Sequence, residues 1–581
     1  MEINLKPKYK ISMDVAFMPI LAALTAFSIW KAPYGYVTSD EAFYLAVPYR
    51  LLQGDALLAQ EWHVSQLSGL LLTPVLWLYY LLGGTSEGII LVFRYIYIAV
   101  QTLTAIYIYL SFRKDEDRAT ISAIAAACVY LMFVPYNIMA LSYNTMDICA
   151  LTIAGVSIAT ANNKWCKMVI GGGTLAFSVL CCPYLAVLYV IYSAAALIHS
   201  GRNKGTEKIS AQPLFKMWWY VTLGVAAVCV VFAVVLLTGA DIYSMLRAIP
   251  NILNDPEHNS FTLSEKLRYF FSDMFFCGVY KNGAAVLTAT ITAALIFILR
   301  KVDRHWEEHR WIYLAVVGVL TLWLIIDRYS WYKHINMINY PLCYAGLCCY
   351  MLSQERDKRV FWLLYVPGWI YALAVHMGSN NNYYSMTMGL SVANVASAMF
   401  VAGVMVELWR ERCSLPRAAA CVLALAILTQ LCVMGKIRAE ECFANVSHLN
   451  VDKVSELTHT IEQGTAKGIR VTDDEYDEYN AVLEETQLVR DAEGENVLYY
   501  SGDIWLYLAD SKHNAGYSAW LSVINNDGAV MLLFNYWKVN PDKLPDVMYI
   551  SKAAVNAEWA MGLLNVNDLA ITETANGYIL Q

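Results

Sequence analysis

Residues 15–30 read VAFMPILAALTAFSIW, an uncharged run that follows Lys6, Lys8 and Lys10. Apolar runs of similar length recur at 66–84, 89–112, 119–137, 148–162, 168–183, 184–198, 217–239, 283–299, 311–326, 338–352, 360–376, 386–408 and 417–434. Of the 581 residues, 58% are hydrophobic and 15% are charged, which is too apolar for a soluble core. The sequence therefore excludes a cytosolic enzyme, a nucleic-acid binder and a disordered scaffold, and it predicts a polytopic α-helical membrane protein.

The basic residues orient these runs, because positively charged loops stay cytoplasmic. The basic loops lie near residues 6–10, 113–118, 164–167, 202–216, 300–310, 356–359 and 410–417. All these loops lie on the same side of the membrane only if the run 66–84 does not cross it. Thr73-Pro74 and Gly83-Gly84 interrupt that run, which agrees with a segment that does not span. We therefore expect about 13 spanning helices, a cytoplasmic N-terminus, and an external loop 34–88 with interfacial helices. No small-residue cleavage site follows the first run, so a cleaved signal peptide is not expected.

The composition changes near residue 435. Residues 436–581 contain 10 Lys+Arg and 23 Asp+Glu, whereas residues 1–435 contain 31 and 25. This predicts a transmembrane domain, 1–435, followed by an extracytoplasmic domain, 436–581. Alternating patterns in the second part predict a small α/β domain, with strands near 468–472, 496–500 and 546–550 and an acidic helix over 473–488. Cys442 is the one cysteine of 14 in that domain, so a disulfide scaffold is excluded there.

Two acidic positions stand at the outer border of the predicted spans. Asp40 and Glu41 follow the first span, where a carboxylate could serve as a base for a lipid-borne substrate. Asp147 lies where the next pair of spans meets the outside. The alternative is that these carboxylates only cap their helices. We further expect Asp40 and Asp147 to converge in one water-filled hollow.

Histidines and carboxylates also occur together in two external loops. Glu61 and His63 lie in the first loop, and His258 lies in the loop 240–282. Such groups could bind a divalent metal ion, although their spacing matches no dedicated metal motif. The alternative is a structural or solvent-facing role.

The order of these features resembles a known family. Asp40-Glu41-x-x-Tyr44 follows the first span, Arg50-Leu51-Leu52-x-Gly54-Asp55 ends the next stretch, an interfacial helix follows, and Arg94 and Asp147 come later. This order is similar to that of the C-type (GT-C fold) membrane glycosyltransferases, most closely the branch of protein O-mannosyltransferases and lipid A aminoarabinose transferases. The resemblance is clearest over residues 14–200. It implies that Asp40 is the catalytic carboxylate and that Asp147 holds the acceptor or the polar face of the donor.

The sequence departs from this family at the interfacial helix. A His-Pro-Pro or Glu-Lys-Pro pattern is replaced by His63-Val64-Ser65-Gln66, which puts the family's donor contacts in question. Cations are still needed beside a leaving phosphate. The candidates are Arg50, Arg94, Lys266 and Arg268. Contact with lipid headgroups is the alternative explanation for Arg50, Lys266 and Arg268.

The sequence thus predicts a glycosyltransferase that moves a hexose or pentose, with inversion, from a polyprenyl-phosphate donor to an acceptor at the outer face of a cell membrane. A bacterial plasma membrane fits the compact C-terminal part best. The acceptor is a glycan, a lipid or a protein, and no nucleic acid is involved. The alternative is a polytopic transporter or flippase of lipid-linked glycans, with functional polar groups near the bilayer midplane. A receptor would leave Asp40 and Asp147 dispensable.

Overall fold

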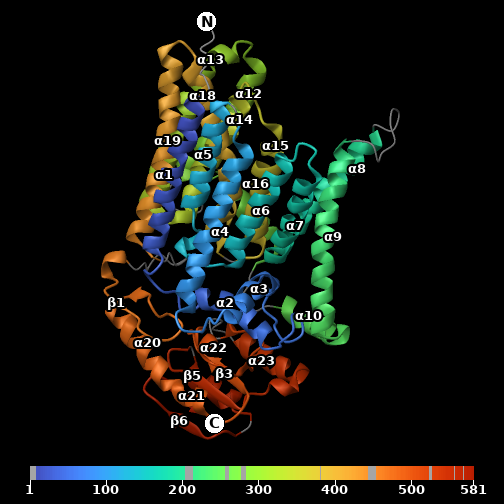
Figure 1. The fold of residues 1–581 in the computed structure, drawn as a ribbon, viewed down its shortest axis with the longest axis vertical. Coiled ribbons are helices and arrows are strands. Elements are labelled where there is room, and N and C mark those ends of the chain that lie inside the picture. The colour runs from blue at the N-terminus through green and yellow to red at the C-terminus, as the bar shows by residue number, and fades with distance from the viewer. Residues whose placement is uncertain are drawn as a thin grey trace.

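The chain forms a helical bundle joined at one end to a C-terminal domain, with short helices between them (Figure 1). The computed structural model describes residues 8–114, 116–202, 213–254, 261–276, 283–379, 381–442, 453–521, 527–554, 556–566 and 568–581. Figure 1 places the N-terminus at the bundle end farthest from the C-terminal domain.

The bundle contains long apolar helices. They are α1 (Lys8–Lys31), α4 (Ile89–Phe112), α5 (Asp117–Met132), α6 (Tyr143–Ala159), α7 (Trp165–Cys181), α8 (Ala186–Arg202), α9 (Pro213–Gly239), α12 (Gly283–Val302), α13 (Trp306–Tyr332), α14 (Asn339–Leu352), α16 (Val366–Met377), α18 (Ser391–Arg410) and α19 (Ser414–Glu440). Each predicted spanning range overlaps one of these helices. The expected break at Cys182-Pro183 is confirmed, because α7 ends at Cys181 and a short 3-10 turn, η2 (Pro183–Leu185), precedes α8.

Nine helices in the described part of the chain are long and apolar enough to cross a membrane. The ranges predicted as further spans coincide with α5, α6, α7 and α14, which have 16, 17, 17 and 14 residues. A helix of about 20 residues is needed to cross a bilayer. The protein is therefore a multi-pass membrane protein, and the count of 13 spans stays a prediction.

Short helices and turns lie at the bundle end nearest the C-terminal domain or connect bundle helices. They are α2 (Asp40–Leu52), α3 (Leu67–Leu81), η1 (Pro135–Asn137), α10 (Ile242–Leu253), α11 (Leu263–Phe271), η4 (Ser272–Phe276), η5 (Ile335–Ile338), α15 (Lys358–Val360), η6 (Phe361–Tyr365) and α17 (Asn382–Gly389). The demoted run 66–84 forms α3, which packs on α2 between the bundle and the C-terminal domain (Figure 1). A Cβ on Gly69 would come within 2.6 Å of Val47, so glycine permits this close approach.

The C-terminal domain is built on a mixed five-stranded sheet in the order β4-β3-β5-β7-β6. Its elements are η7 (Val454–Glu456), β1 (His459–Thr460), β2 (Arg470–Val471), α20 (Asp473–Glu485), α21 (Gln487–Asp491), β3 (Asn496–Tyr500), α22 (Leu506–Ala509), β4 (His513–Asn514), α23 (Asp527–Val539), η9 (Pro541–Lys543), β5 (Val547–Ser551), α24 (Ala557–Leu564), β6 (Ile571–Glu573) and β7 (Gly577–Leu580). Strand β3 pairs in parallel with β4 and β5, and β7 is antiparallel to β5 and β6. The predicted α/β architecture is confirmed.

The two faces of this sheet belong to different cores. Because side chains alternate along a strand, Val497 and Tyr499 of β3 face α20 and α21, while Leu498 and Tyr500 face α23 and α24. The first core continues into α2, α3 and the outer end of α4. The C-terminal domain is therefore packed onto α2 through a shared apolar core.

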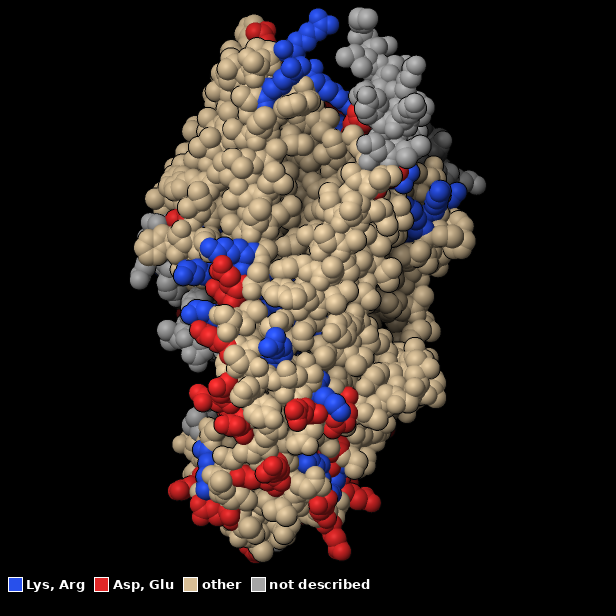
Figure 2. All heavy atoms as spheres, turned by 60° about the vertical axis from the view of Figure 1, so that its left-hand side comes forward, with Lys and Arg blue, Asp and Glu red and all other residues tan. Residues whose placement is uncertain are grey.

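Charge separates the two ends of the molecule. On the face shown in Figure 2, Lys and Arg gather at the bundle end far from the C-terminal domain, and Asp and Glu gather over the C-terminal domain. The surface of the bundle between them is largely uncharged, as expected for the part of a protein that contacts lipid.

Candidate active site

The acidic pair Asp40-Glu41 opens α2, and its two members face different surroundings. Ser39 stands at the N-cap position but makes no cap hydrogen bond with its side chain. Asp40 is half-buried, whereas Glu41 is 2% exposed. Two neighbouring carboxylates are thus given different environments by the first turn of one helix.

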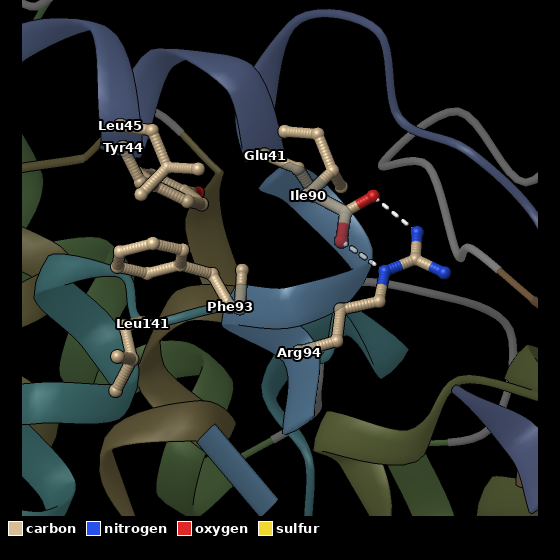
Figure 3. A pocket seen from close by; sticks show the side chains of 8 residues that line it. Glu41, Tyr44, Leu45, Ile90, Phe93, Arg94 and Leu141 are labelled. Carbon is tan, nitrogen blue, oxygen red and sulfur yellow. Dashed lines mark hydrogen bonds and ion pairs between the residues drawn. The ribbon is translucent and has the colours of Figure 1, made fainter. Parts of the chain in front are cut away.

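Glu41 forms a buried ion pair with Arg94 of α4 (Figure 3). The Arg94 Nε donates to Glu41 Oε1 at 2.7 Å, and Nη2 donates to the second carboxylate oxygen. The remaining guanidinium donors bind the carbonyl oxygens of Ala32 and Gly35, both at 2.6 Å. Arg94 therefore fixes the turn that leads into α2. Glu41 and Arg94 also line a small cavity with Tyr44 (Figure 3), and their predicted roles in the reaction stay predictions.

Asp40 is surrounded by tyrosines. The Tyr44 hydroxyl, one turn along α2, donates to Asp40 Oδ1 at 3.2 Å. The ring of Tyr44 meets Tyr143 of α6 edge-on, with centroids 5.7 Å apart. Burial and the charge of Asp40 raise the pKa of Tyr44 well above its ordinary value, so this hydroxyl stays protonated and donates to the carboxylate. The i, i+4 spacing in the sequence explains this contact.

The loop after α5 approaches Asp40 with an unusual backbone. Tyr136 and Asn137 both adopt left-handed conformations, with φ of 54° and 59°. The Tyr136 N–H donates to Asn336 Oδ1 at 3.0 Å, and Asn137 Nδ2 donates to the carbonyl oxygen of Glu441 at 2.6 Å. Non-glycine residues in this region carry strain that is typical of functional sites. The sequence offered no signal for this conformation.

Asp147 lies one turn inside α6. It is 1% exposed, and the Ser178 hydroxyl of α7 donates to its Oδ1. Helix α6 is capped by Ser142 and Thr145, which exchange hydrogen bonds, so Asp147 is not the helix cap. Neither the cavity lined by Glu41 and Arg94 nor the cavity lined by Asp273 and Arg328 has Asp40 or Asp147 in its wall. The shared hollow stays a prediction.

Arg50, at the other end of α2, belongs to a buried ion network with the C-terminal domain. It donates to Asp55, to Glu61 Oε2 at 3.1 Å and to the Tyr536 hydroxyl at 2.7 Å. Lys543 Nζ lies 2.5 Å from Asp55 Oδ1. Burial alone would raise the pKa of Asp55, but Arg50 and Lys543 hold it below its usual value.

This network bears on two further assignments. Arg50 is 2% exposed and makes four hydrogen bonds to protein acceptors, so most of its donors are used within the protein. Glu61 is 0% exposed and accepts from both Arg50 and the His63 N–H. Arg50 and Glu61 thus form a buried ion pair with a structural role.

Two of the predicted metal ligands, Glu61 and His63, lie in the described part of the chain. His63 Nδ1 lies 2.8 Å from Ser65 Oγ, and its ring packs on Phe43 with centroids 4.6 Å apart. His258 lies outside the described residues. Over the ranges that the structure describes, no group of three or more His, Cys, Asp or Glu could hold a metal ion. Glu61 and His63 do not fit a metal site, because Glu61 is occupied by Arg50.

The remaining predicted cations lie on α11. Lys266 is 6% exposed, its ammonium donates to the Met377 carbonyl at 2.8 Å, and burial lowers its pKa. Arg268, two residues further on, is exposed. Arg268 is exposed, whereas the other three candidate phosphate contacts, Arg50, Arg94 and Lys266, are buried.

A second polar group was missed by sequence reasoning. Arg328 of α13 pairs with Asp327 at 2.9 Å and lies over the Tyr332 ring at 5.2 Å. Arg328 also lines a small cavity with Asp273 and Tyr383. Burial raises the pKa of Asp273 to about 7. The available signal was the charge at the end of an apolar run, since ionisable residues in spans are costly.

Aromatic rings connect this cavity to the Asp40 region. The rings of Tyr383 and Tyr384 lie 4.3 Å apart, those of His334 and Tyr384 4.4 Å apart, and those of Tyr136 and His334 5.6 Å apart. Such a row of rings, with polar edges, forms a continuous wall at the bundle end nearest the C-terminal domain.

No protein-family model matches the sequence, and no curated protein matches it. Solved structures of an oligosaccharyltransferase from Archaeoglobus fulgidus are similar in fold. The one tethered to an acceptor peptide containing the NVT sequon is 12% identical, with a TM-score of 0.47, over 92% of this chain and 69% of that chain. The complex with Zn and sulfate is 13% identical, with a TM-score of 0.44, over 92% and 68%. The complex with an inhibitory peptide and a dolichol-phosphate is 12% identical, with a TM-score of 0.41, over 92% and 69%. At these identities and TM-scores, the likeness does not transfer a function to this chain.

Proposed function

We propose that this chain is an inverting membrane glycosyltransferase that uses a polyprenyl-phosphate-linked sugar. The observation that carries the proposal is the environment of Asp40. Its carboxylate is half-buried at the start of α2, accepts from Tyr44, and belongs to a helix held at both ends by buried ion pairs. A carboxylate placed in this way can act as a general base.

In the proposed reaction, Asp40 accepts a proton from the attacking hydroxyl or amine of the acceptor. The acceptor atom bonds to the anomeric carbon from the face opposite the phosphate, so the configuration inverts. The bond from the anomeric carbon to the phosphate oxygen breaks, and polyprenyl phosphate leaves with the electron pair. The protonated Tyr44 orients the Asp40 carboxylate by its hydrogen bond.

The leaving phosphate requires positive charge. Arg268 is exposed on α11, and Arg328 lines the small cavity at the end of α13. We assign the donor phosphate to this side of the bundle. Arg50 and Arg94 are not part of the assignment, because their donors are already used by protein acceptors. The proposal includes no metal step.

The orientation in the membrane is part of the same proposal. The basic bundle end lies in the cytoplasm, and α2, α3 and the C-terminal domain lie outside, as supported by the charge separation in Figure 2. The sugar of a polyprenyl-phosphate donor then faces Asp40, while its hydrocarbon chain stays in the bilayer.

The test is sugar transfer by the purified full chain in lipid nanodiscs. The assay uses a panel of polyprenyl-phosphate hexoses and pentoses with membrane extracts as the source of acceptor. For Asp40→Asn we expect the rate to fall by about 10²–10⁴-fold, which is the usual contribution of a general base, with an unchanged Tm. The matched control is Asp477→Asn, which alters an exposed carboxylate on α20. Transfer by Asp40→Asn at the wild-type rate would reject the base, and transport of the lipid-linked sugar without transfer would support a flippase.

A further inference from the structure

Cys442 occupies a distinctive place at the junction of the two domains. It is the one cysteine of residues 436–581 and follows α19 by two residues. It is buried and takes part in no disulfide. A Cβ on Gly35 would come within 2.4 Å of Cys442 Cβ, so this thiol lies directly against the turn between α1 and α2.

The last residue of α1 makes an unusually close approach to this thiol. Lys31 Nζ lies 2.7 Å from Cys442 Sγ. Nitrogen and oxygen in an N–H···O hydrogen bond are most often about 2.9 Å apart, and sulfur is the larger atom, so this N···S contact is shorter than a hydrogen bond requires. Two single bonds meeting at one oxygen atom would give this separation. Lys31 and Cys442 are 1% and 5% exposed, so both atoms are held in place by packing.

The surroundings of the pair favour an uncharged amine. Arg438 donates to Ser28 Oγ at 3.0 Å, and Arg94 donates to the Ala32 carbonyl at 2.6 Å. Ser28 precedes Lys31 on α1 and Ala32 follows it directly, and the charges of Arg94 and Arg438 both interact with the Lys31 amine. A third positive charge is disfavoured beside two guanidinium groups. Two carboxylates lie in this region: Glu41, which Arg94 binds, and Glu441, which precedes Cys442 and interacts with the charge of Lys31.

We infer that Lys31 and Cys442 are a site of oxidative cross-linking and become joined through one oxygen atom as Nζ–O–Sγ. The oxidant is dioxygen. The amine loses one hydrogen and the thiol loses its hydrogen. One oxygen atom enters the bridge, and the other leaves with both hydrogens as water. Dioxygen is reduced by four electrons, two from the nitrogen and two from the sulfur. Four thiol groups of a reductant restore the amine and the thiol: the bridging oxygen leaves as water, and the four thiols are oxidised to two disulfides.

The bridge would tie the end of α1 to the segment that leads from α19 into the C-terminal domain. Such a covalent link between distant parts of the chain restricts the unfolded state and fixes the junction beside the α1–α2 turn. An oxidising outer compartment would maintain it, and reduction would open it. This inference is independent of the proposed glycosyl transfer.

The experiment is mass spectrometry of the full chain, purified in air and digested without reductant. We expect a linked peptide pair containing Lys31 and Cys442, heavier than the sum of the two peptides by one oxygen atom less two hydrogens. Treatment with dithiothreitol should replace it by the two unmodified peptides. Cys442→Ser and Lys31→Met should each abolish the linked pair.

Maleimide labelling of the wild-type chain in SDS gives a second readout that does not depend on any variant. Cys442 should be labelled only after reduction, whereas Cys413, which is exposed at the start of α19, should be labelled without it. Full labelling of Cys442 without reductant would overturn the inference. A linked pair that lacks the oxygen atom, or oxidation of Cys442 alone, would also overturn it.

Discussion

Buried ion pairs hold both ends of α2, but the surroundings of the carboxylates at the two ends differ. At the last turn, Arg50 is buried with Asp55 and Glu61 and bonded to Tyr536, so every strong acceptor near it is used. At the first turn, Glu41 is consumed in the same way by Arg94, but its neighbour Asp40 stays half-buried beside Tyr44. Asp40 and Glu41 are both carboxylates, and they differ in how many protein groups bind them.

This comparison shows how a reactive carboxylate can be held in position. Breaking a buried pair leaves an uncompensated charge, so both ends of α2 are fixed to their neighbours. Asp40 takes its position from a helix attached to α4 at one end and to the C-terminal domain at the other. The C-terminal domain thus helps to position the proposed base.

The largest effect on stability is expected at the first turn. Arg94→Met leaves the Glu41 carboxylate buried without its partner, which should lower the free energy of unfolding by about 3–5 kcal/mol. Thermal unfolding in detergent measures this as a lower Tm. The double variant Glu41→Gln with Arg94→Met should recover part of the loss. If Arg94→Met abolished sugar transfer without changing the Tm, Arg94 would have a role in the reaction instead.

A smaller effect is expected at the last turn. Lys543→Met removes one of the two cations that hold Asp55, while Arg50 remains, so the loss should be about 1–3 kcal/mol. The measurement is again the Tm. The matched control is Lys552→Met, because Lys552 pairs with Glu573 at 2.8 Å on the surface of the same domain. Equal shifts for both variants would show that the buried network does not fasten the domain.

A third effect is a dependence of stability on pH through Asp273. Burial raises its pKa from 3.8 to about 7 in the folded protein, so the folded state binds its proton more tightly than the unfolded state. Its contribution to stability is full below pH 3.8 and is lost as the pH rises through about 7. The Tm should therefore fall between pH 5 and pH 8, and Asp273→Asn should fall less. The same fall in the variant would assign the effect to another group.

Much of the fold follows from the sequence. Apolar length and periodicity place every bundle helix, and the short apolar and aromatic run within residues 496–500 places β3 at its observed bounds. The interruptions in the run 66–84 anticipate α3 as a short helix packed on α2. Helix length is less predictable, because α14 has 14 residues and its ends depend on packing against neighbours.

The candidate active site is harder to predict from the sequence than the fold. The sequence identifies Asp40 and Tyr44 by spacing, but it cannot show that Glu41 meets Arg94, 53 positions away. The partners of Arg50, which include Tyr536, are also set by tertiary packing. The sequence predicted a role in the reaction for the charged residues near Asp40. In the structure, most of them form ion pairs with residues that are distant in the sequence. The strained backbone at Tyr136 leaves no local signature.

A density map of the full chain with bound polyprenyl phosphate in nanodiscs tests the central claim most directly. The account predicts the phosphate at the bundle end nearest the C-terminal domain, on the Asp40 side, with Arg268 or Arg328 as its contacts and with the Glu41–Arg94 pair intact. A phosphate bound near the bilayer midplane, or at the basic end of the bundle, would contradict it.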